Sequence, residues 1–327
     1  MTWLITGGAG YIGGHVVHQL VAAGERVVVL DDLSSGSRDR LPEGVPLVTG
    51  SVLDRAVLDE ALRAHQVTGV LHIAAKKQVG ESVAEPLHYY HENVEGLRTV
   101  LAAAVAAGVK KVLFSSSAAV YGMPDVDLVT EDTPCAPINP YGETKLVGEW
   151  LLNASAQAYG LSTVSLRYFN VAGAASPVLA DDGVTNLVPM VFQRLTDGLP
   201  PLIFGADYPT PDGTCIRDFI HVSDIASAHV AAVKRLDAAD GPVSLTLNIG
   251  RGEGVSVSEM LAVIARVTGR DIAPEVTPRR PGDPARVVAA ADLIRKELGW
   301  SAEHDVEAMV ASAWEGWLTR HPEARRG

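Results

Sequence analysis

The sequence predicts an α/β protein with a doubly wound parallel sheet, followed by a smaller α/β lobe in the carboxyl-terminal half. Three observations indicate this fold. Short apolar segments of strand length alternate with amphipathic segments of helix length through the first half of the chain. A glycine-rich turn between Gly7 and Gly13 separates the first strand from the first helix. After Gly173, proline and glycine become frequent and the regular alternation ends.

The elements of the first half follow in order from these patterns. Strands are expected at residues 3–6, 27–30, 47–48, 70–73, 111–114 and 163–166. Helices are expected at residues 11–23, 54–65, 86–107 and 141–159, where apolar residues recur with the helical period. Gly24 and Gly108 mark two of the helix ends, because glycine commonly closes a helix.

Two lobes are expected from the change of pattern near Gly173. Residues 1–173 form the first lobe and residues 174–327 the second. Residues 218–250 contain a helix at 222–236 and a strand at 245–249, and they are expected to rejoin the first lobe. The second lobe then closes over the carboxyl edge of the sheet, where ligands bind in folds of this kind.

Composition narrows the classes of function. The net charge is −12 and no basic block is present, which argues against nucleic acid and against an anionic membrane surface as partners. Cys135 and Cys215 show no metal-ligand spacing, so no metal site is expected, and so few cysteines fit a reducing cytosol. No apolar run reaches membrane-spanning length, and the first strand begins almost at Met1. We expect a cytoplasmic protein.

The glycine turn is the first candidate binding site. Gly8, Gly10 and Gly13 fit the pattern G-x-G-x-x-G, and Gly7 gives the wider G-x-x-G-x-x-G form. A lone glycine motif is more often a plain loop, but this one has a strand before it and a helix after it. Asp31 ends the second strand 18 residues beyond Gly13, where a carboxylate can bind both hydroxyls of an adenosine ribose. It would repel a 2′-phosphate, so NAD is favoured over NADP; the plainer interpretation of Asp31 is a turn residue.

Tyr141 and Lys145 are the candidate catalytic pair. They are four residues apart on an expected helix, so their side chains share one face. A phenol loses its proton near pH ~10 in water, and a fixed cation nearby lowers that pKa toward neutrality. Ser117 lies just past the fifth strand, where its hydroxyl can bond the same substrate oxygen. The pair alone is weak evidence, since this spacing is common on amphipathic helices, and a serine run can be a solvated turn.

Several segments together resemble a known family. The glycine turn, Asp31, residues 114–122 and residues 139–145 are similar to the extended short-chain dehydrogenase/reductase family, and more narrowly to the UDP-glucose 4-epimerases. The narrower resemblance continues through residues 79–83, 167–170, 186–189, 207–210, 212–214, 217–222 and 278–283, and so covers essentially the whole chain.

The resemblance implies an isomerase of galactose and carbohydrate metabolism that interconverts UDP-galactose and UDP-glucose. Tyr141 would take the proton from the sugar 4-hydroxyl, Lys145 would lower the pKa of that phenol and hold the nicotinamide ribose, and Ser117 would contact the same sugar oxygen. Hydride would pass to a retained NAD, giving a transient 4-keto sugar, and return to its opposite face. The first lobe would be the NAD-binding Rossmann domain and the second would bind the UDP-sugar. Relatives are often homodimers joined through helices of the first lobe.

The same resemblance assigns the binding residues. The expected NAD contacts are Gly7, Gly10, Tyr11, Ile12, Gly13, Asp31, Asp32, Ser51, Val52, Ala74, Ala75, Lys77, Asn93, Ser115, Tyr141, Lys145 and Phe169. The expected substrate contacts are Lys77, Ser117, Tyr141, Asn170, Asn186, Leu187, Phe204, Arg217, Arg280 and Asp283. Arginines suit a diphosphate, because the guanidinium makes paired, charge-assisted hydrogen bonds.

Ala118-Ala119 separates this chain from related enzymes of other chemistry. Nucleotide-sugar dehydratases carry an Asp-Glu pair there, and decarboxylating relatives a glutamate, so epimerisation is the expected reaction. A UDP-glucuronate 4-epimerase and a non-catalytic NAD-binding sensor are the alternatives.

Three residues depart from the family pattern. Ser51 replaces an aspartate that touches adenine, and Phe219 replaces a tyrosine. Val287 replaces a tyrosine that crowds the sugar in some epimerases, which predicts some activity on N-acetylated UDP-hexosamines.

Overall fold

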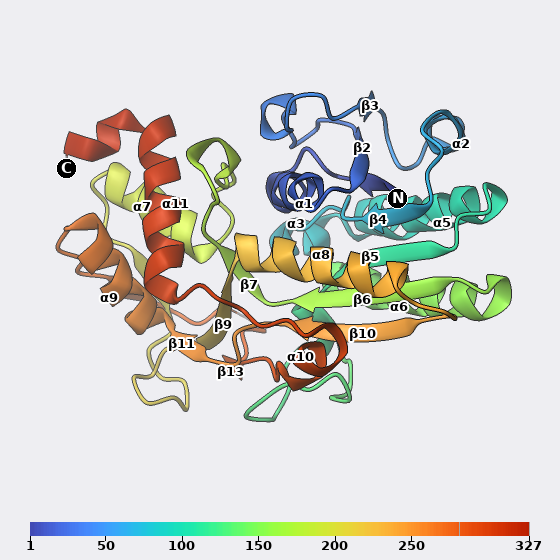
Figure 1. The fold of residues 1–327 in the computed structure, drawn as a ribbon. Coiled ribbons are helices and arrows are strands. Elements are labelled where there is room, and N and C mark those ends of the chain that lie inside the picture. Colours follow the sequence, from blue (N-terminus) through green and yellow to red (C-terminus); the bar gives the residue numbers. More distant parts are fainter. Residues whose placement is uncertain (281, 327) are drawn as a thin grey trace.

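The structure, a computed structural model, describes residues 1–280 and 282–326 and confirms the predicted doubly wound sheet (Figure 1). Seven parallel strands lie in the order β10-β6-β5-β4-β1-β2-β3. Their bounds are β1 (Thr2–Thr6), β2 (Arg26–Asp31), β3 (Leu47–Thr49), β4 (Gly69–His72), β5 (Lys111–Ser117), β6 (Ser162–Tyr168) and β10 (Ser244–Ile249). The strand order reverses between β1 and β4, which places a ligand-binding crevice at the carboxyl ends of these strands.

Helices cover both faces of the sheet because its strands are apolar on both sides. One face packs against α1 (Tyr11–Ala22), α8 (Val222–Asp237) and α10 (Asp292–Leu298); the other packs against α2 (Arg55–Ala64), α5 (Gly96–Ala106) and α6 (Pro140–Tyr159). In β1, Trp3 and Ile5 belong to the first core and Leu4 to the second, as alternating side chains require. Each fully buried side chain of this kind contributes roughly 1.5–3 kcal/mol.

The smaller lobe lies beside the carboxyl edge of the sheet (Figure 1). Its strands are β7 (Asn170–Ala172), β8 (Leu202–Phe204), β9 (Ile216–His221), β11 (Gly254–Ser256), β12 (Glu275–Thr277) and β13 (Arg286–Val287). Helices α7 (Leu187–Thr196), α9 (Val257–Thr268) and α11 (Val306–Arg320) enclose its own apolar core. A boundary near Gly173, with residues 218–250 rejoining the first lobe, remains our proposal for the domain division. Strand β10 pairs with β6, and α8 packs against α1, which supports this division for residues 222–249. Residues 218–221 belong to β9 and pair with β7 and β11 of the smaller lobe.

The expected long helix at residues 86–107 is interrupted. The structure has α3 (Val79–Ala84), α4 (Pro86–Tyr89), a π-helical turn η2 (Tyr90–Glu95) and then α5. The extra residue of the π turn presents Asn93 inward, where its amide donates to the carbonyl of Lys76 and to Thr144 Oγ1, and its Oδ1 accepts from the Lys76 amide. Such turns cost helix regularity and often occur near functional sites.

Strand β5 is longer than predicted, because the serines expected just beyond it continue the ladder to Ser117. Buried hydroxyls need partners, and these have them. Ser115 Oγ lies 2.9 Å from His229 Nε2, and Ser116 donates to Glu149 at 2.5 Å. The serines of β5 are therefore buried residues whose hydroxyls have hydrogen-bond partners inside the core.

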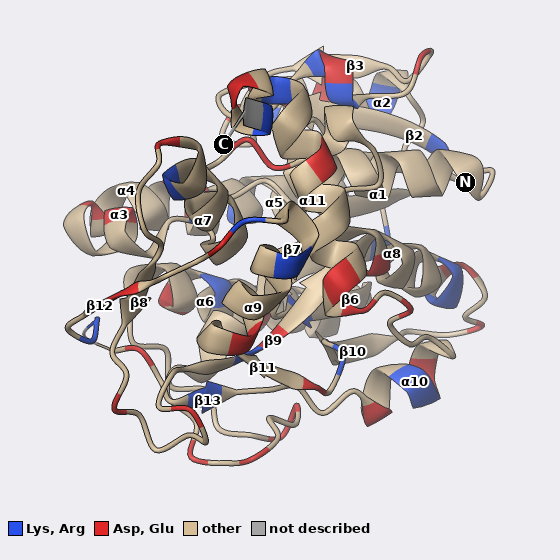
Figure 2. Cartoon of the chain, turned by 90° about the vertical axis from the view of Figure 1, so that its left-hand side faces the viewer, with Lys and Arg blue, Asp and Glu red and all other residues tan. Residues whose placement is uncertain are grey.

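Charged residues of both signs are spread over the elements of the chain, and Figure 2 shows them interspersed along the helices and loops. Within the described residues, every helix is too short or too polar to cross a membrane. The same residues hold no cluster of His, Cys, Asp and Glu side chains suited to a metal ion.

Candidate active site

The glycine turn forms a cradle at the start of α1. Gly10 is the N-cap residue and offers no side-chain cap, so the first amides of the helix are directed toward whatever lies in the crevice. Gly7 has a φ of +71°, which favours glycine. A Cβ on Gly13 would lie 2.0 Å from the Gly7 carbonyl oxygen, so only glycine fits there. The turn leaves space and hydrogen-bond donors for a diphosphate.

Asp31 lies at the end of β2 beside this turn. Its carboxylate is buried and accepts hydrogen bonds from the Ala9 and Leu33 amides, both at 2.9 Å. Burial raises the pKa of Asp31, and the two amides counteract this by stabilising the charged form. Each oxygen keeps further acceptor capacity, as paired ribose hydroxyls would require.

The turn and Asp31 line a cleft of about 270 Å³. Most of the predicted NAD contacts line it: Gly7, Gly10, Tyr11, Ile12, Gly13, Asp31, Asp32, Ser51, Val52, Ala74, Ala75, Lys77, Tyr141 and Lys145. The glycine cradle, the ribose-binding carboxylate and the candidate catalytic pair therefore share one cleft.

Three predicted NAD contacts lie outside this lining. Asn93 holds the Lys76 backbone through the π turn and so positions the loop that carries Lys77. The Ser115 side chain faces His229, and only its carbonyl oxygen faces the pair, as the acceptor for Lys145. Phe169 packs in an apolar cluster with Tyr121 and Val287.

Sequence reasoning missed part of the cleft. Arg40 and residues 181–183 and 185 also line it, and Arg40 pairs with Asp182 at 2.8 Å. Tyr168, at the end of β6, lines it as well. No motif marks Arg40 or the loop; only the position of Tyr168 at a strand end could have indicated it.

Tyr141 and Lys145 lie on the inner face of α6, and both are buried, with 8% and 3% of their surface exposed. Asn139 caps the helix by accepting from the Gly142 amide, and Pro140 occupies its first turn. Lys145 donates from Nζ to the Ser115 carbonyl oxygen at 2.8 Å, and Nζ lies 5.9 Å from the centre of the Tyr141 ring. The helix and the end of β5 are thus tied together at the site.

The titration behaviour of the pair differs from the expectation. Burial raises the pKa of the Tyr141 phenol, and the Ser117 hydroxyl acts in the opposite direction. Burial also lowers the pKa of Lys145 to about 8, against the effect of Glu149. The ammonium is engaged with a carbonyl, so its charge alone does not offset the desolvation of the phenol. Further positive charge nearby would act in the same direction as Ser117 and lower the pKa of this phenol.

A buried ion pair between Arg167 and Glu149 lies next to Lys145 and the end of β5. Arg167 donates from Nε and Nη2 to the two Glu149 oxygens at 2.9 and 2.6 Å, and from Nη1 to the Tyr121 hydroxyl at 2.7 Å. Glu149 is one helical turn beyond Lys145 and also accepts from Ser116. Removing one member of such a buried pair typically costs about 3–5 kcal/mol.

The expected diphosphate residues gather in the smaller lobe. Arg217 Nη2 lies 3.1 Å from Asp283 Oδ1, and Arg280 Nε lies 3.7 Å from the other oxygen. The Arg280 guanidinium also lies 4.0 Å from the centre of the Phe204 ring. Four of the predicted substrate contacts are therefore neighbours, although they come from three separate stretches of the chain. Pro281 of the same motif lies outside the described residues.

The other predicted substrate contacts occupy separate positions. Lys77 lines the cleft, with Nζ 6.0 Å from the centre of the Tyr11 ring. Asn186 occupies the N-cap position of α7, but its side chain donates to Asp181 at 3.1 Å instead of capping the helix, and Leu187 begins that helix. Asn170 begins β7 and is exposed.

The three departures from the family pattern are placed as follows. Ser51 lines the cleft and accepts from the Leu53 amide at 3.1 Å. Phe219 is buried in the apolar core of the smaller lobe. Val287 pairs with Arg217 across β13 and β9, next to the expected diphosphate residues.

Known proteins are similar to this chain in sequence and in structure. The model of the NAD dependent epimerase/dehydratase family matches residues 3–250. A UDP-glucose 4-epimerase of Azospirillum brasilense is 48% identical over 324 residues, which cover 95% of this chain and 91% of that protein. A UDP-glucose-4-epimerase structure from Stenotrophomonas maltophila, with bound NAD and formylated UDP-arabinopyranose, is 39% identical with a TM-score of 0.93, covering 98% of this chain and 99% of the other. The structure of the UDP-Glc/GlcNAc 4-epimerase from Campylobacter jejuni is 37% identical with a TM-score of 0.85, covering 96% and 98%.

The tight packing at Gly13 predicts that a single added methyl group lowers both stability and NAD binding. Gly13→Ala should destabilise the protein by about 1–3 kcal/mol and leave it purified without NAD, because the methyl would meet the Gly7 carbonyl. Thermal unfolding and the NAD content after denaturation measure both effects. Gly241→Ala is the control, since no described atom lies within 4 Å of the added methyl. Normal NAD content in Gly13→Ala would contradict this account of the turn.

Proposed function

The chain belongs to the NAD dependent epimerase/dehydratase family, and we propose that it works as a UDP-glucose 4-epimerase that retains NAD. The observation that carries the proposal is the meeting of Tyr141 and Lys145 with the glycine cradle and Asp31 in one cleft. Ser117 ends β5 next to the pair, and Ala118 and Ala119 follow it without an acidic side chain.

The cleft fits NAD by the chemistry of its donors and acceptors. The glycine cradle has no room for a Cβ at Gly13 and offers helix amides to a diphosphate. Asp31 is a charged acceptor for ribose hydroxyls and is unfavourable to a 2′-phosphate. When bound, NAD supplies the acceptor and donor of hydride together with one positive charge.

The residues of the chain handle the proton and the orientation of the sugar. The Tyr141 phenolate removes the proton of the sugar 4-hydroxyl, and the same phenol returns it when the carbonyl at C4 is reduced again. The Ser117 hydroxyl donates to the sugar oxygen, and Lys145 keeps positive charge close to the phenolate. Arg217 and Arg280 bind the diphosphate, which keeps the nucleotide anchored while the sugar turns over.

Sugar selectivity is the finer part of the proposal. Val287 packs with Phe169 and Tyr121 and pairs with Arg217 in register, so it lies close to the expected substrate contacts. A small side chain there leaves room for an N-acetyl group. The chain should therefore accept UDP-N-acetylhexosamines besides UDP-galactose. The similar protein from Campylobacter jejuni is a UDP-Glc/GlcNAc 4-epimerase.

We also propose a homodimer joined through α3, α4 and α6, which contact one another in the first lobe. Large apolar side chains are exposed there: Leu87 by 84%, Val83 by 63% and Trp150 by 61%. Several large apolar side chains exposed on packed neighbouring helices are typical of a protein interface. Both cysteines are free thiols, which supports a reducing compartment such as the cytoplasm.

The central experiment follows UDP-glucose formation from UDP-galactose without added NAD. The purified protein should form product, and a UDP-sugar should raise the absorbance of reduced nicotinamide. Tyr141→Phe should lower kcat by roughly 10²–10⁴-fold, because proton transfer is lost. Tyr159→Phe, at the exposed end of the same helix, should keep the parent kcat. No product from the parent, with or without NAD, would defeat the proposal.

Selectivity is tested by Val287→Tyr. The larger side chain should lower kcat/KM for UDP-N-acetylgalactosamine by roughly 10–200-fold and leave UDP-galactose nearly unaffected. The ratio of the two kcat/KM values is the measurement. An unchanged ratio would show that Val287 does not set the choice of sugar.

The dimer is tested by Leu87→Asp, which places a charge on the proposed interface. Light scattering should give the mass of a dimer for the parent and of a monomer for the variant. Leu199→Asp, at another exposed leucine, should stay dimeric. A monomeric parent would contradict the proposal.

A further inference from the structure

The segment that directly follows β7, at the junction of the two lobes, is held through three successive backbone groups. The Tyr11 hydroxyl donates to the Gly173 carbonyl oxygen at 2.6 Å, so a residue of the NAD cleft bonds directly to this segment. The Ala174 amide donates to Ser312 Oγ on α11 at 3.2 Å. The Ala175 amide donates to His15 Nε2 on α1 at 3.0 Å. Helices of both lobes thus fix residues 173–175, which we call the crossing segment.

The hydrogen bonds assign the tautomer of His15. Nε2 accepts from the Ala175 amide, and therefore carries no proton. Nδ1 lies 2.8 Å from the Tyr11 carbonyl oxygen, an acceptor, so the ring proton is on Nδ1. Both ring nitrogens are used by a neutral imidazole, and 1% of the residue is exposed. A second proton on Nε2 would point at the N–H of Ala175, so this hydrogen bond would be lost.

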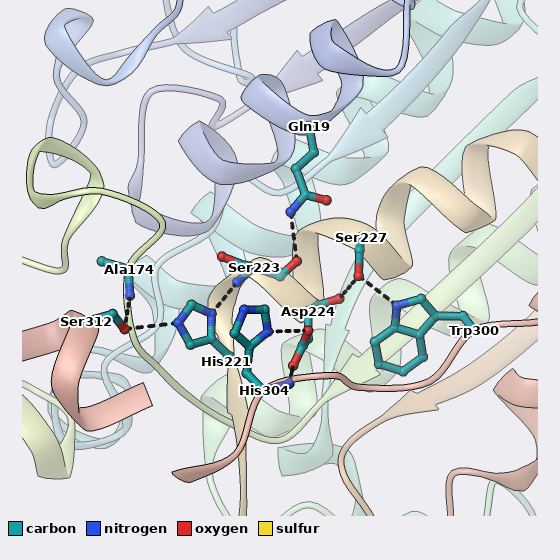
Figure 3. Close-up of polar contacts among 9 residues, drawn as sticks. All are labelled: Gln19, Ala174, His221, Ser223, Asp224, Ser227, Trp300, His304 and Ser312. Carbon is teal, nitrogen blue, oxygen red and sulfur yellow. Dashed lines mark hydrogen bonds and ion pairs between the residues drawn. The ribbon is translucent and has the colours of Figure 1, made fainter. Parts of the chain in front are cut away.

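His221 is fixed in the opposite tautomer (Figure 3). Its Nδ1 accepts from the Ser223 amide at 2.9 Å, so the proton is on Nε2 and points to Ser312 Oγ at 3.0 Å. The Ser312 hydroxyl donates a hydrogen bond to the Met309 carbonyl oxygen at 3.1 Å. The same Oγ therefore receives the Ala174 amide and the His221 ring, and it joins α11 to the crossing segment and to the start of α8.

Close packing leaves the crossing segment little freedom. Gly173 has a φ of +92°, and a Cβ on it would lie 2.5 Å from the His221 ring. His304 stacks on that ring with the two ring centroids 4.2 Å apart, and its Nδ1 lies 2.8 Å from Asp224 Oδ1. Figure 3 shows this stack between α8 and α11, with Gln19 reaching from α1 to the Ser223 carbonyl.

We propose that His15 and His221 are positioning residues that, as neutral rings, clamp the crossing segment and so hold the smaller lobe in register with Tyr11 and the NAD cleft. The proposal rests on the proposed function for its effect on catalysis, but the clamp itself is independent of it. The substrate is bound by arginines of one lobe and reacts at Tyr141 of the other, so a shift of the lobes misplaces the sugar. A misplacement of about 1 Å can cost 10²-fold in rate.

The clamp depends on pH in a defined direction. Burial is the main reason that the pKa of each histidine falls to about 4. The nearby His304 also lowers the pKa of His221. His18 and Arg40 also lower the pKa of His15. Asp224 is the acidic group that faces His221 and opposes the shift. Unfolded histidines bind protons below pH ~6.5, so each ring stabilises the fold above that pH and loses this contribution as the pH falls toward 4. The clamp stays closed at neutral pH and opens in acid.

The test compares two substitutions of His15 in the full-length protein. His15→Leu removes the acceptor, so the Ala175 amide should lose its protection from hydrogen exchange and kcat should fall roughly tenfold with KM and NAD content little changed. His15→Gln places a carbonyl oxygen near the position of Nε2 and should restore both protection and kcat. It should also keep the Ala175 amide protected at pH 4.5, where the parent begins to lose it. His65→Leu, on the other face of the sheet, should match the parent.

Ser312→Ala gives a second, milder variant, because alanine suits the interior of α11. It should expose the Ala174 amide to exchange and lower kcat several-fold. Parent-like protection and kcat in both His15→Leu and Ser312→Ala would overturn the proposal. So would equal loss in His15→Leu and His15→Gln, since a clamp needs only the acceptor. Lost amide protection without any epimerase activity in the parent would instead support the clamp and defeat the proposed function.

Discussion

The hydrogen bond between the Lys145 ammonium and the Ser115 carbonyl oxygen is the contact on which the site depends. It joins the inner face of α6 to the end of β5, and so fixes the phenol of Tyr141 beside Ser117. A buried ammonium is costly to desolvate, and it persists here because a carbonyl accepts from it and Glu149 lies one turn further along the helix. The ion pair behind it therefore maintains the charge that the chemistry requires.

A second constraint is the registration of two lobes that carry different parts of the site. The cradle and the catalytic pair belong to the parallel sheet, whereas Arg217 and Arg280 belong to the smaller lobe. Parallel strands position their own carboxyl ends well, but they do not place a neighbouring lobe. Polar contacts at residues 173–175 supply this placement, and Gly173 is required because the His221 ring occupies the space of a side chain.

Much of this arrangement was predictable from local signals. Apolar periodicity located the strands and helices of the first lobe, and the strand–glycine–helix order located the cleft. The π turn was not predictable, because it exists to bring Asn93 to Lys76, a contact between separate elements. Strand β5 was predicted too short since buried serines look like a solvated loop unless their partners are known. Arg40 and its loop carry no motif at all, and only the folded chain brings them to the cleft.

The burial of Tyr141 also bears on the kind of reaction that the cleft suits. The side chains of Tyr141 and Lys145 are both buried, so the proton taken from a substrate has little direct access to bulk water. A net oxidation would have to release a proton and a reduced cofactor in every turnover. An epimerisation returns the proton to the oxygen from which it came, and the cofactor ends as it began. A nearly closed catalytic pair, with 8% and 3% of its two residues exposed, is therefore better matched to a balanced reversal at one carbon than to net redox chemistry.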